Sequence, residues 1–122
     1  MSTPGHAHAI TIKKNPHRIK VMFNGTVVAD TKQALVLKEG PLSPVNYIPR
    51  EDVQLSYLHQ TNHSTHCPFK GNASYFSLSV NGKTADNAIW TYETPIDAVA
   101  QIKDYVVFYP EKMDAIEELP LD

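Results

Sequence analysis

Apolar and polar residues alternate along two segments of the chain. Ile19, Val21 and Phe23 recur at every second position, which is the period of a half-buried β-strand. Serines separate apolar residues in the same way over 76–80. Shorter apolar or β-rich runs predict further strands at 26–29, 34–37, 45–48, 53–58, 88–92 and 106–109.

Two Asn-Gly pairs interrupt these runs. Asn24-Gly25 and Asn81-Gly82 each stand between β-rich segments. A type I′ turn needs positive φ at both central residues, and Asn-Gly is the pair that best tolerates it. The sequence therefore predicts two tight β-hairpins.

The period changes after the second hairpin. Thr94 is a candidate N-cap and Pro95 suits the first helical position. One apolar stripe follows, formed by Ile96, Val99 and Ile102. We predict a helix reaching about residue 105 and a weaker terminal helix over 113–119. The expected fold is mainly β: compact antiparallel sheets with one main α-helix.

The 122 residues suit a single domain. We expect residues 1–12 to form a mobile N-terminal arm and residues 110–122 an acidic C-terminal tail. Basic residues dominate before Asp30, whereas acidic ones dominate the tail. These ends are either two solvated segments, or they pair with each other within the fold or across a homo-oligomer.

Net charge and composition restrict the classes of binding partner that we expect. A net charge of −2 gives no reason to expect nucleic acid, and no apolar run is long enough for a membrane span. A lone cysteine cannot form an internal disulfide, and the N-terminus lacks a hydrophobic signal region. We therefore expect a cytoplasmic protein with neither nucleic acid nor membrane as partner.

Chemistry-bearing residues gather in one stretch, His59 to Tyr75. Cys67 is a candidate nucleophile, His66 a candidate proton donor or acceptor, and Lys70 a candidate anion clamp. We treat these three as candidate catalytic residues. Neighbours on a strand point apart, however, so His66 reaches Cys67 only if the segment is a loop. The alternative is an inert structural cysteine.

Four further residues are candidates for ligand binding. Arg50 and Asp52 flank a turn, where they either form a structural ion pair or line a pocket. Tyr75 and Trp90 lie on predicted strands, as pocket wall or as core. The cations favour a small anionic ligand. The histidines match no standard zinc spacing, so we predict no metal and no cofactor.

Several segments resemble one known family, the domain of unknown function 427. The matching segments are 27–30, 47–53, 65–71, 73–75, 87–92 and 105–109. The motif His66-Cys67-Pro68-Phe69-Lys70-Gly71 is the most specific of them, and the resemblance spans about residues 10–109. It implies a β-tent fold, in which two antiparallel sheets meet at an angle with a helix alongside.

The resemblance implies little about activity. Zinc-binding β-tent relatives carry paired cysteines, whereas this chain has only Cys67. The family also bears a nucleotidyltransferase-like label. Nucleotidyl transfer generally uses clustered carboxylates to hold a divalent metal, and Asp30, Asp52 and Asp86 are scattered along the chain. We therefore carry neither property over to this protein.

Two functional hypotheses remain. The first is a small-molecule-binding domain, with or without catalysis, whose pocket surrounds the His-Cys-Pro-x-Lys-Gly segment. The second is a non-catalytic structural or protein-interaction domain, in which the same residues brace a loop. Convergence of the polar groups on a cleft favours the first.

Overall fold

Both Asn-Gly pairs form the predicted hairpin turns. Asn24 and Gly25 have φ of 49° and 73°, and Asn81 and Gly82 have φ of 50° and 84°. The first pair joins β2 (Arg18–Phe23) to β3 (Thr26–Thr31), and the second joins β7 (Gly71–Val80) to β8 (Lys83–Tyr92). This part of the fold follows from local turn chemistry.

The computed structural model describes residues 9–121, which form a mainly β fold of three antiparallel sheets. The first sheet has the order β1 (Ile10–Lys14), β4 (Leu35–Glu39), β5 (Val45–Tyr47). The second has the order β10 (Ala115–Leu119), β2, β3. The third has the order β6 (Leu58–Cys67), β7, β8, β9 (Val106–Phe108).

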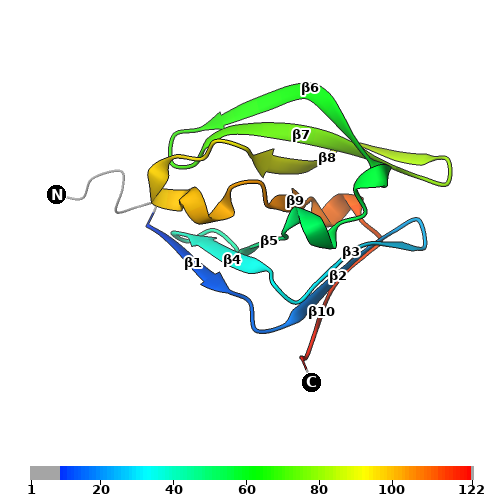
Figure 1. Ribbon diagram of the computed structural model, residues 1–122, viewed down its shortest axis with the longest axis horizontal. Helices are drawn as coiled ribbons and strands as arrows, with labels where there is room; N and C mark the ends of the chain where they lie inside the picture. Colours follow the sequence, from blue (N-terminus) through cyan, green and yellow to red (C-terminus); the bar gives the residue numbers. More distant parts are fainter. Residues whose placement is uncertain (1–8, 122) are drawn as a thin grey trace.

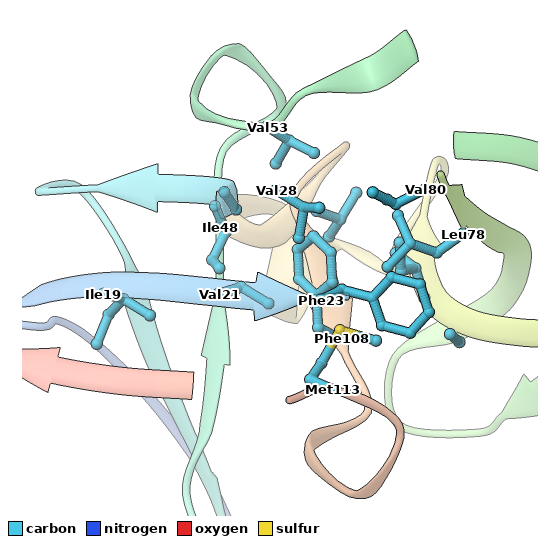
Figure 2. Close-up of a cluster of buried hydrophobic side chains, with 14 of the residues drawn as sticks. Ile19, Val21, Phe23, Val28, Ile48, Val53, Leu78, Val80, Phe108 and Met113 are labelled. Carbon is cyan, nitrogen blue, oxygen red and sulfur yellow. The ribbon is translucent and has the colours of Figure 1, made fainter. Parts of the chain in front are cut away.

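Figure 1 shows the third sheet above the other two. Two clusters of buried side chains lie between these layers. Between the second and third sheets, buried Phe23, Leu78 and Phe108 pack in one cluster, drawn in Figure 2. Between the first and third sheets, Tyr47 and Tyr92 belong to another. A backbone bridge between Ile48 and Val106 joins β5 to β9. The first and third sheets therefore meet at this junction.

The predicted main helix is wrong. Residues Asp97–Ile102 form only a short 3-10 segment, η3, that begins after Ile96 without a side-chain cap, and Val99 leaves helical geometry at φ −126°. The apolar stripe at 96, 99 and 102 has a spacing of three, which is the period of a 3-10 helix rather than an α-helix. The other 3-10 segments of residues 9–121 are η1 (Arg50–Asp52), η2 (Leu55–Tyr57) and η4 (Pro110–Lys112).

Since Thr94 caps no helix, its substitution should have little effect. Thr94 is exposed. We expect Thr94→Ala to change the free energy of unfolding by less than about 0.5 kcal/mol, as for most surface substitutions. Urea denaturation measures this. A loss of about 1 kcal/mol or more would instead indicate a side-chain cap.

Two other local predictions are wrong. Residues 53–57 form no strand: Val53 makes an isolated bridge to Ala29, η2 follows, and only Leu58, the first residue of β6, is in a strand. The stretch we expected to be loop-like is largely strand, because β6 runs to Cys67. Its polar residues reflect two exposed faces rather than a loop. β1 begins at Ile10, inside the segment 1–12 that we expected to be a mobile arm, and residues 1–8 of that segment lie outside the described residues.

The acidic tail contains a strand where we predicted a helix. β10 pairs antiparallel with β2, and Glu117 lies opposite Lys20. The His17 Nδ1 atom lies 3.3 Å from the Glu118 Oε1 atom. Backbone pairing with β2 overrides the weak helical pattern of this segment. The pairing of β10 with β2 corresponds to the alternative in which the two charged ends of the chain pair within the fold.

Candidate functional site

The His-Cys-Pro-x-Lys-Gly motif forms the turn between β6 and β7. The Lys70 N–H donates to the Cys67 carbonyl at 3.1 Å, and Cys67 pairs with Gly71 across the hairpin. Pro68 suits the second position of such a turn because its φ is fixed. Gly71 has φ of 118°, and a Cβ there would lie 3.3 Å from the Thr94 carbonyl oxygen. The motif therefore builds a tight turn packed against the 94–96 segment.

The turn directs Lys70 toward the first sheet. The Lys70 Nζ atom donates to the Glu39 Oε1 atom at 2.5 Å, and the two side chains are 12% and 10% exposed. Glu39 is the last residue of β4. This ion pair therefore links the β6–β7 turn to the first sheet in a largely desolvated position, where charge attraction is strong.

A cavity opens beside this ion pair, with a volume of about 270 Å³. Strand β8 supplies Trp90 and Tyr92, β7 supplies Tyr75, and β5 supplies Tyr47. We call it the tyrosine pocket, and its complete lining is Leu37, Glu39, Leu42, Ser43, Val45, Tyr47, Lys70, Tyr75, Trp90, Tyr92 and Tyr109. Five aromatic rings and one ion pair thus share one concave surface.

Contacts between side chains orient the rings. Tyr75 and Trp90 are cross-strand partners. The Tyr75 hydroxyl shares a 3.0 Å hydrogen bond with the Thr65 Oγ1 atom, and the His63 ring lies edge-on to Tyr75 with centroids 4.5 Å apart. Trp90 packs on Tyr109 with centroids 4.6 Å apart. The pocket wall is therefore braced from strands β6, β7 and β8 and from the segment after β9.

Burial raises the pKa of three of the phenols in the pocket. It raises the pKa of Tyr47 to about 12, opposed by a hydrogen bond from Trp90. Burial also raises the pKa of Tyr92. For Tyr109, burial and then a hydrogen bond with Tyr75 raise the pKa to about 12. At neutral pH these hydroxyls are uncharged groups that can donate or accept hydrogen bonds.

These shifts predict an alkaline loss of stability. The folded pKa of Tyr47, about 12, exceeds the unfolded value near 10, so the folded state retains a proton that the unfolded state loses. The contribution is fully present below about pH 10, and it is lost as the pH rises from about 10 to about 12. Denaturation across this range, with phenolate absorbance of the native protein, measures it.

Tyr47→Phe should reduce the delayed part of the absorbance change, whereas Tyr57→Phe, outside the pocket, controls for the loss of one phenol. Full ionisation of every tyrosine in the folded protein at pH 11 would contradict the expectation.

The structure separates two of the predicted catalytic residues. His66 is exposed, and its Nδ1 atom lies 2.7 Å from the Asn72 Oδ1 atom. Cys67 is half-buried and packs against the core cluster that contains Tyr47 and Tyr92. Because successive residues of a strand point to opposite faces, the two side chains form no nucleophile–base pair. Of the three, only Lys70 lines the tyrosine pocket.

Two of the four predicted ligand-binding residues, Arg50 and Asp52, lie outside the tyrosine pocket. The Arg50 Nε atom donates to the Asp104 carbonyl at 2.9 Å, and its guanidinium lies 5.5 Å from the centre of the Phe76 ring. Asp52 accepts a 2.7 Å hydrogen bond from Thr31 and lines a shallow polar depression with Arg18, Asp30, Lys32 and Gln33. Tyr75 and Trp90, by contrast, line the tyrosine pocket.

Sequence reasoning missed eight of the eleven lining residues, and those of them with charged or aromatic side chains are Glu39, Tyr47, Tyr92 and Tyr109. One signal was available for Tyr92, which alternates with Trp90 on a predicted strand and therefore shares its face. Glu39 offered none, because a charged residue that follows Lys38 ordinarily indicates a solvated strand end.

A second cavity of about 300 Å³ adjoins the first, and we call it the apolar pocket. Its lining comes from β2, β5, β8, β9, β10 and residues next to β5 and β9: Ile19, Pro44, Val45, Asn46, Ile48, Trp90, Val107, Phe108, Pro110 and Ile116. Val45 and Trp90 line both cavities.

Within residues 9–121, no three His, Cys, Asp or Glu side chains are grouped so that they could hold a metal ion. The same part of the chain contains no helix with the length and apolar character needed to cross a membrane.

Comparison with known protein families assigns the chain to one of them. The family described as "Domain of unknown function (DUF427)" matches residues 11–119, and the chain belongs to this family. This confirms the resemblance found in the motif segments. No curated protein matches the chain.

Proposed function

We propose that this protein is a small-molecule-binding domain whose ligand occupies the tyrosine pocket. One observation carries the proposal: an aromatic-lined cavity of about 270 Å³ contains the buried Lys70–Glu39 ion pair. Ligand sites are typically concave and aromatic with a few polar groups that fix orientation. A merely structural role would call for no such convergence of rings and charges on open space.

The ion pair limits the charge of the ligand. An anion that approached Lys70 would also meet the Glu39 carboxylate, and a cation that approached Glu39 would meet the Lys70 ammonium group. Arg50, the other cation that we expected at the site, is held by Asp104 and Glu93 outside the pocket. We therefore replace the small anionic ligand of our sequence prediction with an uncharged one.

The hydrogen-bonding groups of the ion pair further restrict the chemical class of the ligand. Lys70 offers N–H donors and Glu39 offers carboxylate acceptors, side by side. An amide or lactam presents the complementary pair, a carbonyl toward Lys70 and an N–H toward Glu39. A planar ring attached to it would stack among the aromatic residues. The proposed ligand is a small planar molecule that carries an amide or lactam edge.

Catalysis is not part of the proposal. Cys67 and His66 lie on opposite faces of β6, so neither activates the other. The proposed role of Lys70 is to orient the ligand together with Glu39.

Benzamide tests the proposal, and Trp90 reports on it, because this single tryptophan lines the pocket. Benzamide should change the tryptophan emission in a saturable manner with a dissociation constant of roughly millimolar, as expected for a fragment of this size. Benzoate and benzylamine, which keep the ring but carry a charge, are matched controls and should bind at least about tenfold more weakly.

Each alternative has a distinct outcome. Tighter binding of benzoate than of benzamide would restore the anionic ligand. No saturable response to any of the three, with no shift of Tyr75 or Trp90 amide resonances, would overturn the binding proposal. It would then favour a structural or interaction role.

A further inference from the structure

The apolar pocket has a different chemical character from the tyrosine pocket. Asn46 is the one side chain in its lining that carries an amide, and its Oδ1 atom already accepts a 2.9 Å hydrogen bond from Asn15. The rest of the lining consists of aliphatic, aromatic and proline side chains. No charged side chain is among them, so this cavity suits hydrocarbon rather than polar groups.

The two cavities are neighbours along three segments of chain. In the 42–46 segment, Leu42 and Ser43 line the tyrosine pocket, Pro44 and Asn46 line the apolar pocket, and Val45 lines both.

The other two segments show the same division. Trp90 lines both cavities. Tyr109 lines the tyrosine pocket, whereas the adjacent Phe108 and Pro110 line the apolar pocket. The Trp90 and Tyr109 rings pack with centroids 4.6 Å apart. The separating wall is therefore about one side chain thick.

We infer that the two cavities are subsites for one amphipathic ligand, an inference that rests on the proposed function. The amide-bearing ring would lie in the tyrosine pocket beside Lys70 and Glu39. A short hydrocarbon arm would pass the edge of Trp90 and lie against Val107, Phe108 and Ile116. This arm would contribute affinity by leaving water, whereas the polar head would determine orientation.

Affinities of benzamide and 4-butylbenzamide test the inference. The butyl compound should bind at least about tenfold tighter, since each buried methylene adds a favourable transfer free energy. A matched control, 4-(3-aminopropyl)benzamide, has an arm of the same length that ends in an ammonium group. It should show no such gain, because the apolar pocket offers this charge no partner.

Amide resonances of the wild-type protein show where the arm lies. The butyl compound should shift the amide resonances of residues 107–109 and Ile116 beyond the shifts that benzamide causes. In Ile116→Asn, the affinity ratio of the two compounds should fall below about threefold. In Leu55→Asn, an exposed position outside both cavities, the ratio should stay at tenfold or more. The wild-type resonances decide the matter even if Ile116→Asn fails to fold.

The outcomes separate this inference from the proposed function. If benzamide binds and the butyl group adds nothing, the inference is overturned and the proposed function stands. If the butyl group adds affinity without shifts of the amide resonances of residues 107–109 and Ile116, the arm lies elsewhere and the inference is overturned. If neither compound binds, both fail.

Discussion

Lys70→Met should lower the free energy of unfolding by about 3–5 kcal/mol, the typical cost of removing one partner from a buried ion pair. The substitution keeps much of the side-chain volume but removes the ammonium group that lies 2.5 Å from the Glu39 carboxylate. Both side chains are nearly buried, so water replaces the lost interaction poorly. Urea denaturation at neutral pH measures the loss.

Two controls isolate the ion pair. Lys38→Met removes the lysine next to Glu39 in the sequence, which donates to the Gly40 and Leu42 carbonyls but pairs with no carboxylate in these contacts, and should cost only about 1.5–2 kcal/mol. The double variant Lys70→Met/Glu39→Leu should recover much of the loss, because an apolar pair of similar volume leaves no buried charge. A double variant as unstable as the sum of both single variants would show that the two residues act independently.

Gly71→Ala should cost about 2–4 kcal/mol, from backbone strain together with overpacking. The φ of 118° at Gly71 lies in a region that L side chains rarely adopt, and the new Cβ would lie 3.3 Å from the Thr94 carbonyl oxygen. Since this turn also directs Lys70, the variant should weaken binding of benzamide as well. Denaturation and tryptophan emission measure the two effects.

Gly25→Ala is the matched control. Gly25 also has positive φ, at 73°, but nothing lies within 4 Å of the place that a Cβ would occupy there. The expected cost is about 1–2 kcal/mol, that of a left-handed L-residue alone. Equal losses at the two positions would show that the contact with Thr94 adds nothing.

The sequence-based predictions were accurate where local interactions determine the structure, and they failed where contacts between distant residues determine it. Asn24-Gly25 and Asn81-Gly82 specify their turns through their own φ preferences, so both hairpins were predictable. The 94–102 segment depends on distant contacts: the Ile96 N–H donates to the Lys70 carbonyl at 3.0 Å. Local capping signals could not reveal this contact, and the three-residue spacing of its apolar stripe was compatible with two kinds of helix.

The candidate site shows the same limit. The motif marked the turn that presents Lys70, and the β-rich run 88–92 predicted the strand that carries Trp90. The buried ion-pair partner of Lys70 is Glu39 on β4, and only the tertiary structure brings these two residues together. Arg50 was a candidate for the pocket because it flanks a turn, but in the fold its side chain donates to the Asp104 carbonyl. Residue type predicted the chemistry better than it predicted the direction of each side chain.

The position of β10 at the edge of β2 has a consequence for protein synthesis. During translation, β2 and β3 leave the ribosome well before residues 115–119, which complete their sheet. Until then the outer edge of β2 offers unpaired N–H and C=O groups to any other strand, a state that favours aggregation. A chain truncated before residue 115 would therefore keep this edge of β2 unpaired.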